Sequence, residues 1–287
     1  DIIKNVKAML MHKLGNIVVN NTDNLLISGF VGVITAGIYS NYYLIIGSVR
    51  QVLDQAFQGV AASVGNLGIT EEKEKVHQVF LQLFFIGQWM YGVAGICLFE
   101  MLNPFVELAF GKKYLFPVEV VLVLCVNFAI NGAKKSVTIF KESMGLFWND
   151  RYKAIVEAVL NLGISVALVV RLGVTGVFLG TIFSMLLTSV WIEPYVIYKH
   201  SFERSSAEFF LTYGKNLVVM GLVWLCTNYC CMIFQGGAFV NLLFRMCVCA
   251  VVPNVLLWLA YRRSEEWKRL FELMKKIVIK VRGKIKG

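Results

Sequence analysis

Ionisable and amide side chains recur at intervals of three or four residues along four otherwise apolar stretches of the chain. At about 100° per residue, this spacing places each set on one face of a helix. A charge that faces lipid at the bilayer centre costs roughly 2.5 to 3.5 kcal/mol, so these faces favour a water-filled cavity between helices. The four sets are His12, Asn16, Asn20 and Asp23; Ser48, Arg50, Gln51, Asp54, Gln55 and Gln58; Asn127, Asn131, Lys134, Thr138 and Lys141; and Asp150, Lys153, Glu157, Asn161 and Ser165.

The chemistry of such a cavity would be binding. Guanidinium and ammonium groups such as Arg50 and Lys134 hold phosphate or diphosphate by charge-assisted hydrogen bonds. The carboxylates Asp23, Asp54 and Glu157 instead suit Na+ or a proton, as intramembrane carboxylates of transporters do. The residues alone leave both ligand classes open.

Several of these polar residues have explanations that need no cavity. Single amides such as Asn161 are commonly hydrogen-bonded between helices, at about 0.6 kcal/mol each. Arg50 and Asp54 are four residues apart and can neutralise each other on one helix. Lys135 lies off its stripe, so its ammonium can extend to the lipid headgroups. Arg245 has no ionisable neighbour on its own stretch, and its role stays open.

Residue patterns for covalent catalysis or transition-metal binding are missing. The seven cysteines lie in apolar stretches without zinc-ligand spacing, as expected of small apolar side chains. The three histidines lie near the ends of apolar stretches and belong to no metal-binding motif. A membrane enzyme would need a cluster of such groups near one face, and the longest outer connection, 103–116, contains no histidine. We therefore expect no metal, no cofactor and no enzyme activity.

The composition is that of a membrane protein. Of the 287 residues, 57% are apolar and 16% are charged, and the mean hydropathy is +0.67, whereas soluble domains contain about a quarter charged residues. The long apolar blocks exclude soluble, disordered and collagen-like classes. The net charge of +10 is better explained by membrane connections than by nucleic acid.

About 20 residues cross the hydrocarbon core as a helix, which predicts an all-α polytopic membrane protein with about eight transmembrane helices. Glycine, proline and charged runs predict where the helices break. The predicted breaks are Gly32–Gly37, residues 71–75, Asn103–Pro104, Phe116–Pro117 and Gly173–Gly176, and the predicted spans are 10–30, 36–66, 78–102, 117–145, 153–172, 174–198, 208–233 and 238–261.

The distribution of lysine and arginine among the connections predicts the orientation. An even number of spans places both termini on the same side of the membrane. That side carries ten basic residues before the tail, against three on the other side, so both termini are expected in the cytoplasm. The ten are Lys4, Lys7, Lys13, Lys73, Lys75, Lys141, Arg151, Lys153, Lys199 and Arg204, and the three are Lys112, Lys113 and Arg171.

The tail, residues 263–287, is expected to form a basic amphipathic helix on the anionic cytoplasmic leaflet. Ser264, followed by Glu265 and Glu266, is a plausible helix start. The alternative is a helix that docks onto a partner protein. The apolar positions are Trp267, Leu270, Phe271, Met274, Ile277, Val278 and Val281, and the intervening basic positions are Lys268, Lys275, Lys276, Lys280 and Arg282.

Two stretches resemble the second half of bacterial polysaccharide flippases of the multidrug/oligosaccharidyl-lipid/polysaccharide exporter superfamily. They are NNTDNLLISGFVGVITAGIYSNYYLI at 20–45 and NDRYKAIVEAVLNLGISVALVVRLGVTGVFLGTIFSML at 149–186. The resemblance covers nearly the whole chain and rests on order and spacing rather than on a catalytic motif. Its most specific features are Asp23, Gly37–Asn41, Asn149–Arg151, Glu157, Asn161, Gly176, Gly180 and Thr181.

The resemblance implies two six-helix lobes around a central cavity that opens alternately to either side of the bacterial plasma membrane. This chain would supply the second lobe (1–205), two additional helices (206–262) and the tail. Alternating access needs two bodies that move about a shared site. The first, N-terminal lobe is therefore an expected partner, and we expect a chain that begins at Asp1 to be a fragment of a longer protein.

The resemblance further implies transport of an undecaprenyl-diphosphate-linked oligosaccharide to the outer leaflet, for lipopolysaccharide or other polysaccharide biosynthesis. The other expected partners are membrane lipids, with Na+ or H+ as a coupling ion and no nucleic acid. The alternatives are a drug/cation antiporter of the same superfamily, a membrane enzyme and a non-transporting membrane subunit. In the first interpretation Arg50 and Lys134 attract the diphosphate, while Asp23, Asp54 or Glu157 tune the site or couple an ion. The complete set of cavity candidates is Arg50, Lys134, Asp23, Asp54, Gln51, Gln55, Gln58, Asn127, Asn131, Glu157 and Asn161.

Overall fold

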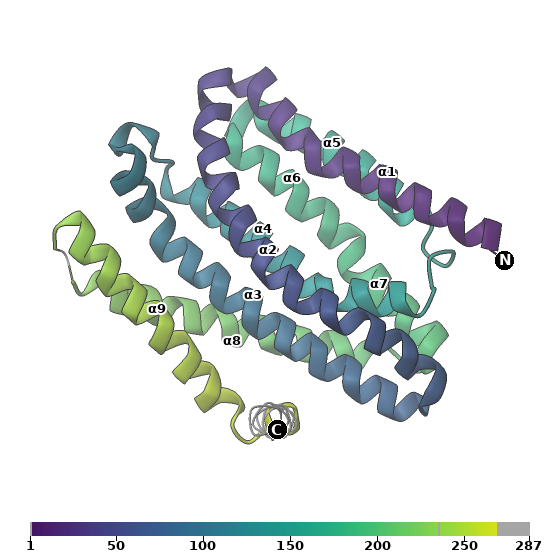
Figure 1. Cartoon of the computed structure of the whole chain (residues 1–287). Helices are drawn as coiled ribbons and strands as arrows, with labels where there is room; N and C mark the ends of the chain where they lie inside the picture. The colour runs from purple at the N-terminus through teal and green to yellow at the C-terminus, as the bar shows by residue number, and fades with distance from the viewer. Residues whose placement is uncertain (1, 235, 269–287) are drawn as a thin grey trace, which may run out of the picture.

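The computed structural model describes residues 2–234 and 236–268, apart from the side chains of residues 2, 4, 20, 60, 62 and 69. All regular elements in this part of the chain are helical, which confirms the all-α fold (Figure 1). The elements are α1 (Ile2–Leu26), π-helical η1 (Ile27–Val31), α2 (Val33–Thr70), α3 (Lys73–Phe110), 3-10 turn η2 (Lys112–Tyr114), α4 (Val118–Ser143), α5 (Lys153–Leu172), α6 (Val174–Leu187), α7 (Ser189–Ile197), π-helical η3 (Tyr198–Phe202), α8 (Ala207–Met232) and α9 (Ala238–Tyr261).

Six of the eight predicted spans are long and apolar enough to cross a membrane. They are α3, α4, α5, the segment from α6 to η3, α8 and α9. The first two predicted spans form the helices α1 and α2, but their polar stripes and the lysines of α1 lower the hydropathy. With 38 residues each, α2 and α3 are about 57 Å long at 1.5 Å per residue, nearly twice the roughly 30 Å of hydrocarbon. These two helices therefore extend beyond the hydrocarbon or cross it at a tilt.

One predicted helix break is wrong, and one break was not predicted. Helix α3 continues through Pro104 to Phe110. Proline has no N–H for the carbonyl four residues earlier, that of Glu100, and this carbonyl instead accepts a hydrogen bond of 3.1 Å from Arg245. The predicted span 174–198 is interrupted at Thr188, whose backbone (φ −131°, ψ −89°) separates α6 from α7.

Helices α1 and α2 form a V that frames the functional site. They meet at η1 and diverge from there (Figure 1). Gly32, between η1 and α2, has φ +124°, a conformation that side chains disfavour. Gly37, the other end of the predicted break, lies inside α2. The walls behind the V are α4, α5 and α6. Helices α5 and α6 can pack closely because Gly180 has no side chain; a Cβ at this position would lie 2.6 Å from the backbone nitrogen of Ser165.

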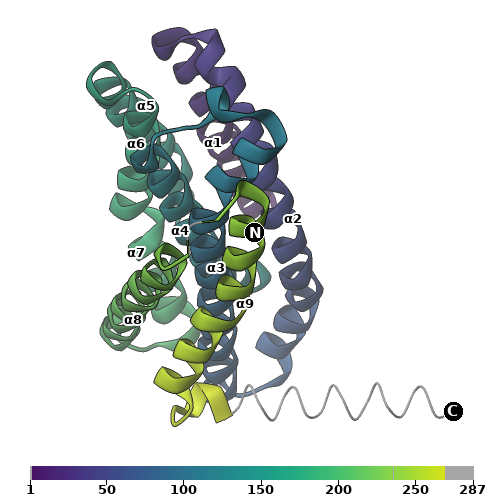
Figure 2. The ribbon, with the colours of Figure 1, turned by 90° about the vertical axis from the view of Figure 1, so that its left-hand side faces the viewer.

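Helices α8 and α9 are attached to α3, on the side of the bundle opposite to α1 (Figures 1 and 2). The contacts include buried polar groups. Arg245 of α9 pairs with Glu100 of α3 at 2.9 Å, which gives this arginine a structural partner. Asn216 of α8 donates to Gln88 of α3 at 2.5 Å and accepts from Tyr261 of α9 at 2.6 Å. No residue of α8 or α9 lines the cavity between α1 and α2 that is described below.

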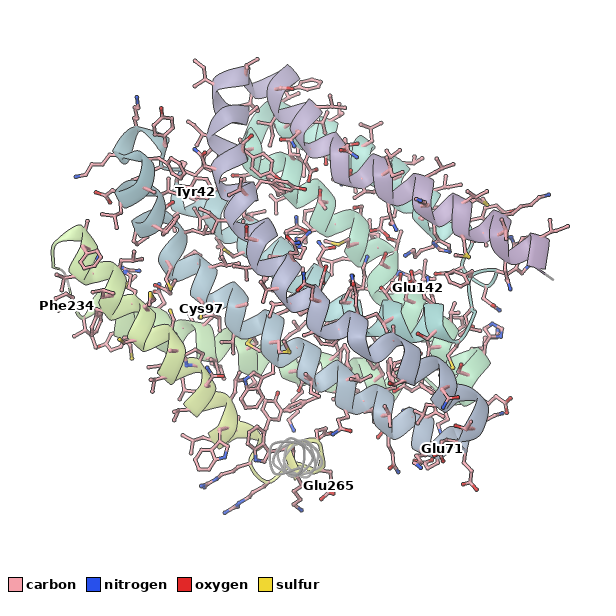
Figure 3. All side chains as sticks on the ribbon, viewed as in Figure 1. Tyr42, Glu71, Cys97, Glu142, Phe234 and Glu265 are labelled. Carbon is pink, nitrogen blue, oxygen red and sulfur yellow. The ribbon has the colours of Figure 1, made fainter. Side chains whose placement is uncertain are left out.

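Consecutive helices run in opposite directions, apart from α7, which continues α6, and the connections alternate between the two ends of the molecule (Figure 1). Figure 3 shows Glu71, at the α2–α3 turn, far from Phe234, which follows α8. Two of the ten basic residues that predict the orientation, Lys141 and Lys153, are buried and paired. They are not loop charges, so the count becomes eight against three, and the cytoplasmic location of both termini stays a prediction.

The start of the tail is described, and the rest of it is not. Ser264 accepts a hydrogen bond of 3.2 Å from the backbone N–H of Trp267, as expected of a helix start. The ring of Trp267 stacks on Trp89 of α3, with ring centroids 5.1 Å apart. The amphipathic positions from Leu270 to Arg282 lie outside the described residues.

Candidate functional site

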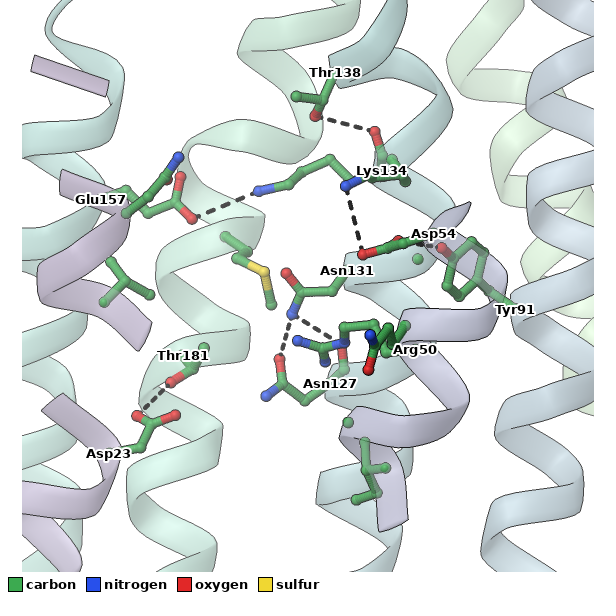
Figure 4. A pocket seen from close by; sticks show the side chains of 18 of the residues that line it. Asp23, Arg50, Asp54, Tyr91, Asn127, Asn131, Lys134, Thr138, Glu157 and Thr181 are labelled. Atoms are coloured by element: carbon green, nitrogen blue, oxygen red, sulfur yellow. Dashed lines mark hydrogen bonds and ion pairs between the residues drawn. The ribbon is translucent and has the colours of Figure 1, made fainter. Parts of the chain in front are cut away.

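A cavity of about 700 Å³ lies between α1, α2, α4, α5 and the α6–α7 pair. Ten of the eleven predicted cavity residues line it, so the stripes on four separate helices meet in one place (Figure 4). Asn161 is the exception, because it is fully buried behind the wall. The side chain of Asn20 lies outside the described residues. The ten are Asp23 from α1; Arg50, Gln51, Asp54, Gln55 and Gln58 from α2; Asn127, Asn131 and Lys134 from α4; and Glu157 from α5.

The formal charge of the described cavity wall is balanced rather than positive. Nearly every cation lies close to a carboxylate; for example, the Nζ atom of Lys134 lies 3.8 Å from Glu157. Arg50 differs, because none of the described carboxylate oxygens lies within 4.0 Å of its guanidinium nitrogens. The expected i, i+4 pairing of Arg50 with Asp54 is thus not observed. The five cations are Arg50, Lys134, Lys135, Lys141 and Lys153, and the five carboxylates are Asp23, Asp54, Glu142, Glu157 and Glu193.

Asp54 contacts two residues that were not among the predicted cavity residues. The Nζ atom of Lys135 lies 3.5 Å from one carboxylate oxygen, and the hydroxyl of Tyr91 donates to the other at 2.5 Å. Lys135 therefore points into the cavity and does not extend towards the lipid headgroups. Its position next to Lys134 was the available signal, since consecutive helical residues lie only about 100° apart.

An amide-rich wall surrounds Arg50. Asn131 donates to the side chain of Asn127 at 2.8 Å, and both lie beside Arg50 in Figure 4. The exposed side chains of Gln51, Gln55 and Gln58 line the cavity from α2, the helix that also carries Arg50. Because each carboxamide offers both donors and acceptors, this part of the cavity suits a ligand with many hydroxyl groups.

A network of buried ion pairs closes the end of the cavity near the α4–α5 connection. Glu193 of α7 is 1% exposed and contacts Lys153 at 2.5 Å and Lys141 at 3.6 Å. Lys141 also pairs with Asp150 at 2.6 Å, and His12 of α1 lies 3.1 Å from the same carboxyl group. Burial raises the pKa of Asp150, but the contact with His12 and the charge of Lys141 outweigh it and hold this pKa below its usual value.

Glu157 joins the cavity to the break between α6 and α7. One carboxylate oxygen accepts a hydrogen bond from the hydroxyl of Ser189 and lies 3.2 Å from the hydroxyl of Thr188, which donates to the carbonyl of Ser184 at 2.6 Å. The other oxygen faces Lys134 (Figure 4). The sequence places Glu157 on a polar stripe, but it gives no sign of this contact, because nothing in the sequence predicts the break at Thr188.

Three oxygen-bearing side chains meet at the far end of the cavity. The hydroxyl of Thr181 donates to Asp23 at 3.3 Å and accepts from the amide of Asn161 at 2.8 Å. The amide oxygen of Asn161 is buried and has no hydrogen-bond partner among the described residues. Oxygen donors of this kind suit a hard cation. Among the described residues, no group of three His, Cys, Asp or Glu side chains could hold a metal ion.

Comparisons with known proteins add no relative. The sequence matches no family model, no curated protein and no solved structure.

Proposed function

We propose that this chain forms the substrate-binding half of a membrane transporter. Its substrate would be undecaprenyl-diphosphate-linked oligosaccharide, carried across the bacterial plasma membrane for polysaccharide assembly. The observation that carries the proposal is the polar cavity inside an apolar helical bundle, with one guanidinium group, that of Arg50, left without a carboxylate partner among the described residues. The resemblance to polysaccharide flippases supplies only the substrate class, a lipid-linked oligosaccharide.

Pairing decides which cation is available to an anionic headgroup. Lys141 and Lys153 hold buried carboxylates at 2.6 and 2.5 Å, so a ligand would have to break strong contacts to use them. Arg50 has no such contact, and its fork of N–H groups binds two phosphate oxygens at once. Lys134 and Lys135 lie at longer distances from their carboxylates, 3.8 and 3.5 Å, and can support the same headgroup.

The remaining cavity wall suits the sugars. Amides recognise hydroxyl groups by hydrogen bonds, and five amide side chains line the cavity on α2 and α4. A volume of about 700 Å³ lies within the range of about 300 to 1,000 Å³ for small-molecule sites. The cavity would therefore hold the diphosphate and the first sugars, while the lipid tail stays in the bilayer.

Binding by the chain in lipid nanodiscs tests this proposal. We expect inorganic pyrophosphate and undecaprenyl diphosphate to bind in calorimetry. Arg50→Gln should weaken both about 10- to 100-fold, because a hydrogen bond to a charged group contributes about 1.5 to 3 kcal/mol. Arg171→Gln is the matched control, since Arg171 is exposed at the end of α5 and does not line the cavity. Absence of binding, or equal affinities of the two variants, would overturn the proposal.

A cation antiporter is the second candidate, and the contact between Asp23 and Thr181, with the unpartnered oxygen of Asn161 behind it, favours it. In that case Asp23→Asn would abolish Na+-dependent stabilisation of the chain, whereas Arg50→Gln would leave cation binding unchanged. Pyrophosphate binding that is lost in Arg50→Gln and kept in Asp23→Asn would reject an antiporter without an anionic substrate.

A further inference from the structure

Helix α7 is a short segment between two irregular turns. Its nine residues are separated from α6 by the non-helical Thr188 and are followed by the π-helical turn η3. Pro194, inside α7, has no N–H group, so the carbonyl four residues earlier lacks its usual helical donor. Irregular backbone at membrane depth persists only where other groups satisfy it. The side chains that hold α7 therefore decide whether it stays in this position.

Two carboxylates hold α7 in place. Glu157 accepts the hydroxyl hydrogen of Ser189, the first residue of α7, and lies 3.2 Å from the hydroxyl of Thr188 at the break. Glu193, on α7 itself, contacts Lys153 at 2.5 Å. Lys153 lies between these carboxylates, because its Nζ atom is also 4.0 Å from Glu157. Lys153 is therefore attracted by both carboxylates at once. If its attraction to one of them becomes stronger, its contact with the other becomes weaker.

Lys134 is the most exposed cation of this network, with 18% of its side chain exposed against 6% for Lys153 and 2% for Lys141. It lines the cavity next to the amides around Arg50 (Figure 4). Its Nζ atom lies 3.8 Å from Glu157, which is an ion pair but longer than a hydrogen bond. An anion placed between Arg50 and Lys134 offers this ammonium closer oxygen atoms. Lys134 can thus exchange Glu157 for the ligand, after which Glu157 keeps the hydroxyl of Ser189 as a donor and Lys153, at 4.0 Å, as its nearest cation.

We infer that Glu157 couples anion binding in the cavity to the position of α7. This inference rests on the proposed function, because it takes an anion at Arg50 and Lys134 as its first step. Once Lys134 turns to the anion, Glu157 attracts Lys153 more strongly, and the contact of Lys153 with Glu193 weakens. Occupancy of the cavity therefore loosens α7, which forms part of the cavity wall through Glu193.

Hydrogen exchange of the full chain in nanodiscs tests the coupling, with inorganic pyrophosphate as the probe. At saturation we expect the amides of residues 188–197 to exchange several-fold faster, while those of α8 stay unchanged. Lys134→Gln should remove this response. Arg171→Gln is the control, because it removes one positive charge at an exposed residue at the end of α5 that does not line the cavity. Arg171→Gln should keep the response.

A second variant makes the test independent of Lys134. Glu157→Gln keeps a side-chain oxygen that can accept from Ser189 but removes the charge that competes for Lys153, so residues 188–197 should exchange more slowly than in the wild type and should not respond to pyrophosphate. Calorimetry on the same samples separates the two proposals. Wild-type binding without any change in exchange would overturn the coupling alone, as would a response that persists in Lys134→Gln or in Glu157→Gln. Absence of wild-type binding would overturn the proposed function.

Discussion

Replacement of Glu193 by leucine should destabilise the folded protein strongly. Glu193 is 1% exposed and accepts from Lys153 at 2.5 Å and from Thr138 at 2.8 Å. In Glu193→Leu, Lys141 keeps Asp150 at 2.6 Å. Lys153 keeps only Glu157, at 4.0 Å. The variant therefore leaves one buried ammonium group without a close partner.

The expected magnitude follows from this unpaired charge. Removal of one partner of a buried ion pair costs about 3 to 5 kcal/mol, whereas replacement of the whole pair by apolar residues is often neutral. Glu193→Leu should thus lower the free energy of unfolding by about 3 kcal/mol or more. The double variant Glu193→Leu/Lys153→Met should recover most of that loss, because it removes the charge that the single variant leaves unpaired.

Unfolding by SDS in mixed micelles measures these free energies, with an exposed pair as the control. Lys112 and Glu107 are 3.6 Å apart, and the lysine side chain is 85% exposed. Glu107→Leu should therefore change the free energy of unfolding by no more than about 1 kcal/mol. The reasoning is refuted if Glu193→Leu costs no more than Glu107→Leu, or if the double variant is less stable than Glu193→Leu.

Three further predictions concern other parts of the fold. Arg245→Ala leaves the buried Glu100 carboxylate with a hydrogen bond from Asn228 but without a cation, and its backbone carbonyl without a donor, so the same SDS titration should show a loss of about 3 kcal/mol. Gly180→Leu drives a side chain into the backbone of α5 and should abolish the monodisperse peak in gel filtration, whereas Gly163→Leu, with open space at its Cβ position, should not. The lowered pKa of Asp150 stabilises the fold at neutral pH, and this contribution is lost as the pH falls below about 4, towards the lowered value. Asp150→Asn should be less stable at neutral pH and should lack this part of the acid-induced loss; equal pH profiles would contradict the assignment.

The sequence predicts the elements and the polar faces well, because both follow from local periodicity. The range 153–172 predicted for α5 is the observed helix, and α9 also has its predicted bounds of 238–261. The stripes on α1, α2, α4 and α5 point to one cavity because an isolated charge facing lipid is too costly. The four faces could therefore be combined without any knowledge of how the helices pack.

The partners of individual charges could not be predicted, because they depend on contacts between distant parts of the chain. Arg245 appears isolated in the sequence, but in the fold it contacts Glu100, from which it is 145 residues apart along the chain. It donates to the backbone carbonyl of Glu100, which Pro104 leaves without its usual N–H donor. For the same reason, a proline that usually ends a helix lies inside α3. Lys141 and Lys153 read as loop charges, but Glu193 of α7 binds both.

The ligand preference of the cavity follows from the pairing of its charges rather than from their number. Five cations and five carboxylates among the described residues sum to zero, which favours neither an anion nor a cation. Four of the cations lie within 4.0 Å of a carboxylate, and Arg50 does not. Two of the five carboxylates, Asp23 and the exposed Glu142, have no described cation within the same distance, and Asp23 has a hydroxyl partner. Under the proposed function, the unpaired guanidinium and the unpaired carboxylate of Asp23, on different helices, would hold an anionic headgroup and a coupling cation together. The two ligand classes suggested by the sequence are therefore compatible, and the ion would offset the charge that the headgroup brings.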